Sequence, residues 1–183
     1  MKKHDEGYAL VFVLVVMAVL GIVATTLMTG AMKNLQAQNT SLFQMQAKYK
    51  AQGEIEKAIQ VIRTEPRINS QTQQNESTIY NILLGEYGPN GQYIPGVRDA
   101  IDGITDGVEW VVEVDNTGKT ILKWKDSKSC LISLRATKPG VLIECTVVLK
   151  NAVNSEGLPV EIEYESYHIE YMDTSATEGG AVE

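Results

Sequence analysis

Residues 4–34 read HDEGYALVFVLVVMAVLGIVATTLMTGAMKN, and this stretch decides the fold. No residue between Tyr8 and Met32 carries a charge. A helix needs about 20 apolar residues to cross the hydrocarbon core of a bilayer, and this run is longer. A cleaved secretory signal has a shorter apolar core, about 7–15 residues, followed by a cleavage site of small residues. The segment therefore predicts a membrane helix that stays in the chain.

The charges around this segment indicate its orientation. Lys2 and Lys3 precede the apolar run and Lys33 follows it, which favours a cytoplasmic N-terminus with the C-terminal domain outside. We expect a single-pass protein of the cytoplasmic membrane. The formal net charge of −7 argues against a nucleic-acid partner, because such proteins present basic surfaces.

The helix is expected to continue well beyond the membrane. The first proline is Pro66, and the residue before a proline avoids the helical region, so one helix is predicted from Tyr8 to about Arg63. Its half over residues 8–32 is apolar all round, and its half over 33–63 is amphipathic. The apolar positions of the second half follow spacings of three, four and seven residues, typical of one helical stripe: Leu35, Leu42, Met45, Tyr49, Ile55, Ile59 and Ile62.

The remainder of the chain predicts an α+β fold. Residues 64–107 are rich in glycine and proline and are expected to be irregular, with a short helix over 77–84 capped by Ser77 and a helical turn over 96–101. From residue 108 to 172 apolar residues alternate with polar ones, as in an antiparallel sheet with one buried face. The sheet is expected to cover the stripe of the long helix. A change of apolar phase after Ser166 predicts either a β-bulge or a strand break at that point. Residues 173–183 are expected to be disordered.

Two cysteines lie on the apolar faces of adjacent predicted strands. If Lys138 and Pro139 form a two-residue turn, Cys130 faces Val147 and Cys145 becomes its diagonal neighbour. A small shift of register would bring the two sulfurs within disulfide range. Two interpretations therefore stay open: a disulfide, or two buried free thiols.

No pattern in the sequence predicts an enzyme or a cofactor. There is no CxxC pair, and the only histidines, His4 and His168, have no nucleophile and base around them in the sequence. We expect a structural protein without catalytic residues.

The N-terminus, KKHDEG followed by YALVFVLVVMAVLGIV, resembles that of type IV prepilins and pseudopilins. The later stretch AKYKAQGEIEKAI is similar to a block of PilX-like minor pilins, and SLRATKPGVLIECTVVLK is similar to their last hairpin. The resemblance implies a leader over residues 1–7 that a prepilin peptidase removes between Gly7 and Tyr8, with methylation of the new N-terminus. It also implies partnership with other pilins or pseudopilins, and a final location in a cell-surface filament.

One position departs from the family pattern. Most members carry glutamate at the fifth mature position, thought to pair with the N-terminus of a neighbouring subunit, and this chain has Phe12. The K-type pseudopilin of type II secretion lacks the glutamate too, which favours a minor pilin at the filament tip or one that primes assembly. Small residues at Ala18, Gly21 and Ala24 would permit close packing of helices, although such residues are also ordinary in the composition of membrane helices, and both interpretations stay open.

Two further alternatives stay open. Some pseudopilins bind calcium in the loop that here contains Asp99, Asp102 and Asp106, but the spacing does not match an EF-hand, and a solvated acidic loop is the simpler interpretation. The main rival to a pilin is a membrane-anchored extracellular binding domain that does not polymerise. Among filaments, a pilus, a secretion pseudopilus and a DNA-uptake filament all remain compatible with the sequence.

Overall fold

The computed structural model describes residues 5–68, 74–153 and 158–172. The start of the expected leader, residues 1–4, and the expected disordered tail, residues 173–183, lie outside the described residues. The chain forms two compact units, Met1–Phe43 and Gln44–Glu183. The predicted α+β class is confirmed: a long N-terminal helix is followed by an antiparallel sheet, on which the last turns of the helix pack.

Helix α1, Asp5–Thr64, is continuous, in close agreement with the predicted span of 8–63. It ends at Glu65-Pro66, as expected from the backbone restriction before proline. Within the second unit, residues recurring every three or four positions form one buried helix face. Three of its six members are alanines, whose small side chains allow the helix backbone to approach the sheet closely: Ala47, Ala51, Ile55, Ala58, Ile59 and Ile62.

The predicted apolar stripe is therefore correct only in its last part. Leu35, Leu42, Met45 and Tyr49 are all more than half exposed. Tyr49 follows Ala47 by two residues, which places it about 200° further around the helix. The predicted stripe leaves out the alanines, and the buried face of the helix includes them in place of Met45 and Tyr49.

The segment between helix and sheet contains more regular structure than expected. Helix α2, Glu76–Leu84, is capped by Asn75, whose side-chain oxygen accepts a hydrogen bond from the Thr78 N–H at 2.8 Å. Asn75, and not Ser77, is thus the N-cap. Strands β1, Glu86–Tyr87, and β2, Tyr93–Ile94, form a small hairpin, and helix α3, Val97–Ile104, extends the predicted turn by several residues.

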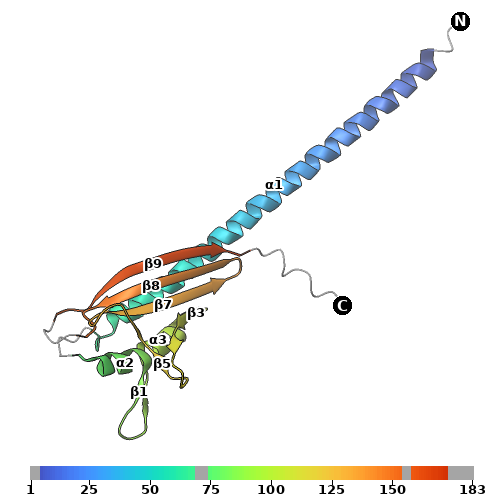
Figure 1. The fold of residues 1–183 in the computed structure, drawn as a ribbon. Helices are drawn as coiled ribbons and strands as arrows, with labels where there is room; N and C mark the ends of the chain where they lie inside the picture. The colour runs from blue at the N-terminus through green and yellow to red at the C-terminus, as the bar shows by residue number, and fades with distance from the viewer. Residues whose placement is uncertain (1–4, 69–73, 154–157, 173–183) are drawn as a thin grey trace. The chain divides into compact units, whose positions relative to one another are not determined.

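The main sheet is antiparallel and has the strand order β3-β7-β8-β9, with β6 also paired to β7 (Figure 1). Its three long strands are β7 (Cys130–Lys138), β8 (Val141–Lys150) and β9 (Glu161–Tyr171). Alternate residues of β7 and β8 are buried, as the sequence predicts. The last turns of α1 run alongside these strands, and side chains of both layers form one hydrophobic core.

The predicted strand over residues 108–114 is interrupted. Strand β3, Val108–Val111, pairs with β7, whereas β4, Glu113–Val114, leaves the sheet and pairs with β5, Thr120–Ile121. Val114 is exposed as a result, whereas the alternation of apolar residues that begins at Val108 would place it on the buried face. Strand β6, Lys123–Trp124, then returns to β7.

Of the two alternatives for the change of apolar phase, a bulge and a strand break, the structure has the bulge, which lies in β9. Thr146 pairs with Ser166 and Val147 pairs with Tyr164, so Glu165 is the extra residue on β9. This insertion keeps Tyr164 and Tyr167 on the same face of the sheet as their partners in β8, the buried Val147 and Cys145.

Candidate functional site

The N-terminal half of α1 is the one described helix long and apolar enough to cross a membrane. None of the side chains in its most apolar window is buried within the protein. Large apolar side chains that no protein atoms cover require an apolar environment of another kind. The helix is therefore compatible with a membrane anchor, as the sequence predicts.

The polar side chains of this segment form hydrogen bonds within the helix itself. Thr25 donates to the carbonyl oxygens of Gly21 and Ile22 at 3.1 and 2.9 Å. Thr26 donates to Ile22 at 2.8 Å, and Thr29 donates to Thr25 at 2.8 Å. No threonine hydroxyl here needs a water partner, which lowers the free energy of placing the segment in lipid.

The predicted processing junction lies in the first turn of α1. Gly7 and Tyr8 are both helical, and the Tyr8 side chain is 83% exposed. Phe12, one turn further on, is also exposed. Nothing in the described part of the chain covers either aromatic side chain, so both remain accessible to a partner.

The small residues expected to pack against other helices lie on one side of α1. At 100° per residue, Ala18, Gly21 and Ala24 fall within an arc of about 120°. A Cβ atom added to Gly21 would meet nothing within 4 Å. The geometry leaves this side of the helix open to close approach.

The two cysteines are not brought together. The turn consists of Pro139 and Gly140, with a φ of 82° at Gly140, as a type II turn requires. Cys130 therefore pairs with Leu149 and Cys145 with Leu134, so the partner of Cys130 lies two residues beyond the Val147 that a turn of Lys138 and Pro139 would give. The cysteines lie four residues apart along the ladder, roughly 13 Å, which exceeds the reach of a disulfide.

Both thiols are free and buried. Burial raises the pKa of Cys130 to about 12 and that of Cys145 to about 11. Such thiols are poor nucleophiles near neutral pH and act as small core side chains. Of the two interpretations that the sequence leaves open, the structure has the two buried free thiols.

Two of the three aspartates considered for calcium have separate structural roles, and the third, Asp102, is exposed on α3. Asp99 accepts hydrogen bonds from the Gly96 N–H at 2.8 Å and from the Tyr93 hydroxyl at 2.7 Å. Asp106 pairs with Lys138, which holds the pKa of its carboxyl below the usual value. Throughout residues 5–68, 74–153 and 158–172, no three carboxylate, histidine or cysteine side chains gather in a way that could hold a metal ion.

An open groove that the sequence did not predict lies between α1 and β9. It has a volume of about 530 Å³ and is lined by Gln52, Glu56, Tyr164 and Tyr167. The Tyr164 hydroxyl donates to Glu56 Oε1 at 2.9 Å. Desolvation and this bond raise the pKa of Tyr164 to about 12. The phase change after Ser166 indicates that two tyrosines lie beside the bulge, but it does not indicate that α1 lies next to them.

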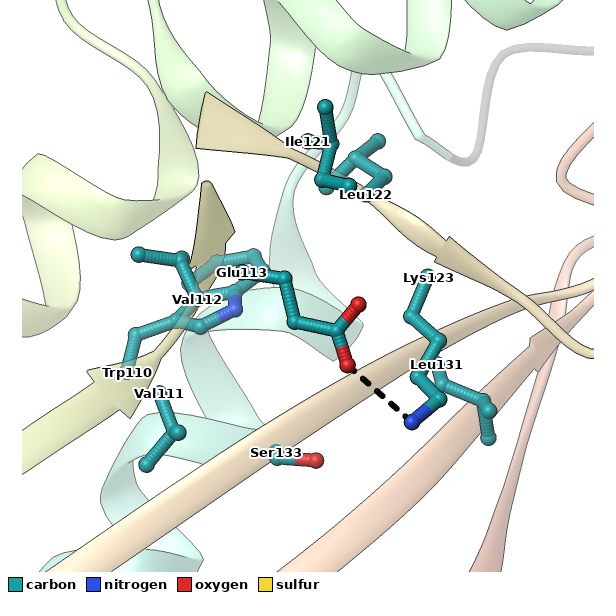
Figure 2. A pocket seen from close by; sticks show the side chains of 9 residues that line it. All are labelled: Trp110, Val111, Val112, Glu113, Ile121, Leu122, Lys123, Leu131 and Ser133. Carbon is teal, nitrogen blue, oxygen red and sulfur yellow. Dashed lines mark hydrogen bonds and ion pairs between the residues drawn. The ribbon is translucent and has the colours of Figure 1, made fainter. Parts of the chain in front are cut away.

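A second hollow lies where β4 leaves the main sheet (Figure 2). Its volume of about 70 Å³ suits a few water molecules and not a drug-sized ligand. Lys123 Nζ contacts Glu113 Oε1 at 3.1 Å across it, and Trp110 forms part of its wall. We interpret this hollow as a packing irregularity of the interrupted strand.

Comparison with protein-family models, with curated proteins and with solved structures finds no match to this chain. The function is therefore argued from its residues and geometry.

Proposed function

We propose that the chain is a minor type IV prepilin, a structural protein and not an enzyme. A prepilin peptidase would cleave it between Gly7 and Tyr8 and methylate the amino group of Tyr8. The mature chain would then join the tip of a type IV pilus or a related pseudopilus, or prime its assembly.

The observation that carries this proposal is the composition of α1. A charged N-terminal cap ends at Gly7, an uncharged helical segment follows to Met32, and the same helix continues until its last turns pack on an antiparallel sheet. A discarded signal peptide does not need to form one helix with the folded domain. A helix that packs against other subunits while it holds its own domain does need to be continuous with that domain.

Removal of the leader has a direct physical consequence. Residues 1–7 include Lys2, Lys3, Asp5 and Glu6, and charged groups resist entry into hydrocarbon. Once they are gone, the apolar helix can leave the bilayer at lower cost and exchange lipid contacts for contacts with other helices. The open side formed by Ala18, Gly21 and Ala24 suits that exchange.

Phe12 supports a position at the tip. A buried ammonium group needs a charged partner. A subunit with phenylalanine at this position cannot offer a carboxylate to the N-terminus of the subunit above it. The tip is the one position where no subunit lies above.

Cleavage tests the proposal. We expect co-expression of the full chain with a prepilin peptidase to shorten it by residues 1–7, as intact mass spectrometry would detect. Gly7→Val should block this cleavage, whereas Gly30→Ala, a control in the same helix, should not. An uncleaved wild-type chain would favour the rival function, a non-polymerising membrane-anchored binding domain.

A further inference from the structure

The edge of the main sheet formed by β9 is the most distinctive surface outside the N-terminal helix. β9 is the last strand in the order β3-β7-β8-β9, and it is paired with β8 on one side only among the described strands. Alternate residues of such a strand direct N–H and C=O groups outward without a partner. Spanning Glu161–Tyr171, it is also the longest strand of the sheet.

The face of β9 that points towards α1 is only partly covered. Tyr164, Tyr167 and Tyr171 pair with the buried residues Val147, Cys145 and Val141 of β8, so they share the apolar face. Their own side chains nevertheless remain 49%, 41% and 52% exposed. The open groove beside Gln52 and Glu56 begins at the same place. A strand added beyond β9 would bury the tyrosines and direct its inward side chains into the groove.

The opposite face of β9 is acidic. The strand contains four glutamates and no lysine or arginine. Glu163 pairs with Lys150 and Glu165 with Lys125, while Glu161 and Glu170 carry no ion pair in the described part of the chain. Two copies of this edge would bring like charges opposite one another, which is destabilising. The charge pattern therefore disfavours pairing of β9 with a second copy of itself.

We propose that β9 is a docking edge for an extended segment of a partner protein, which adds to the sheet as a further strand. This segment carries lysine or arginine at alternate positions on its outward face and small or apolar residues on its inward face. Main-chain hydrogen bonds to β9 supply affinity, and the glutamates supply selectivity for basic segments. The inference is independent of the filament proposal, because it needs neither cleavage nor assembly.

Binding of a synthetic probe peptide to the full chain in detergent micelles tests this inference. The probe is KTKVKVKTK, and its control is KTKPKPKTK, which has the same charge but lacks two N–H donors. At about 0.15 M salt, where attraction between distant charges is screened, we expect the probe to bind and the control to bind at least about tenfold more weakly. Equal binding of both peptides would overturn the proposal, because it would reflect charge alone.

Variants of the chain locate the binding. Glu161→Lys with Glu170→Lys should weaken binding of the probe by about tenfold. Asp102→Lys with Glu109→Lys, the same change of charge at exposed positions away from β9, should have a much smaller effect. If the two double variants lose equal affinity, the peptide does not recognise β9.

Hydrogen exchange gives a readout specific for strand addition. The outward amides of β9 should exchange quickly in the free chain and become protected when KTKVKVKTK binds. Protection already present in the free chain would contradict the proposal, since another part of the protein would then cover the edge. Binding without new protection in β9 would contradict it as well.

Discussion

Tyr164 of β9 donates a hydrogen bond to Glu56 of α1 at 2.9 Å, joining residues 108 positions apart in the sequence. This bond connects the edge strand of the sheet to the helix that covers it. The pKa of Tyr164, about 12, lies above the ordinary value of about 10 for tyrosine. The folded state therefore holds the phenolic proton more tightly than the unfolded chain does.

The sign of this shift predicts a loss of stability at high pH. The raised pKa of Tyr164 adds to the free energy of unfolding. This addition is fully present below pH 10 and is lost as the pH rises from about 10 to about 12. We expect Tyr164→Phe to lower the free energy of unfolding by about 1 kcal/mol at neutral pH. The variant's free energy of unfolding should also depend less steeply on pH between about 10 and about 12. Denaturant titration of the full chain in micelles would measure both, with Tyr49→Phe as an exposed control.

The face of α1 that contacts the sheet can be tested by paired truncations. Ile59 is fully buried and Tyr49 is largely exposed. Ile59→Ala should lower the free energy of unfolding by about 2–5 kcal/mol, because it removes buried methyl groups and leaves a cavity. Tyr49→Ala should change it by less than about 0.5 kcal/mol. Equal effects in denaturant unfolding would mean that the sheet covers a different face.

Gly96 should tolerate no side chain. A Cβ atom there would lie 2.3 Å from the Gly85 nitrogen and 2.7 Å from the Leu83 carbonyl oxygen, and backbone cannot give way as a flexible side chain can. We expect Gly96→Ala to destabilise the protein by at least about 2 kcal/mol. Gly103→Ala, in open space within α3, should be neutral or stabilising by up to about 1 kcal/mol. A melting temperature unchanged by Gly96→Ala would contradict the close approach of these segments.

The free thiols predict slow chemical modification. Cys130 and Cys145 should react with iodoacetamide far more slowly in the folded chain than after unfolding, because both are buried and have raised pKa values. A cysteine placed at the exposed Ser127 should react quickly and serves as the control. Mass spectrometry without reductant should count two free thiols in the wild type. A mass two hydrogens lower would reveal a disulfide and a different register.

Much of this fold could be predicted from local patterns. The position of Pro66 and the alternation in β7 and β8 act through short-range physics, and the helix end and the strands that they predict are confirmed. The uncharged run forms part of one long helix, as the sequence predicts. The bulge at Glu165 was visible as a change of apolar phase. These features depend on neighbouring residues alone.

The errors concern choices that depend on tertiary contact. A turn of Pro139 and Gly140, shifted by one residue from the expected turn, changes the partner of Cys130 from Val147 to Leu149. The sheet packs against alanines of α1, which a search for large apolar residues overlooks. The groove at Glu56 and Tyr164 requires two elements to meet, so no single stretch of sequence could reveal it.

The proposed function requires that α1 packs against the helices of other subunits once residues 1–7 are removed. Its most direct test is the intact mass of the chain recovered from sheared surface filaments of cells that produce the prepilin peptidase and the other pilins. We expect a chain that begins at Tyr8, carries one added methyl group and is present in the filament fraction. A chain that still begins at Met1 and stays entirely in the membrane fraction would contradict it.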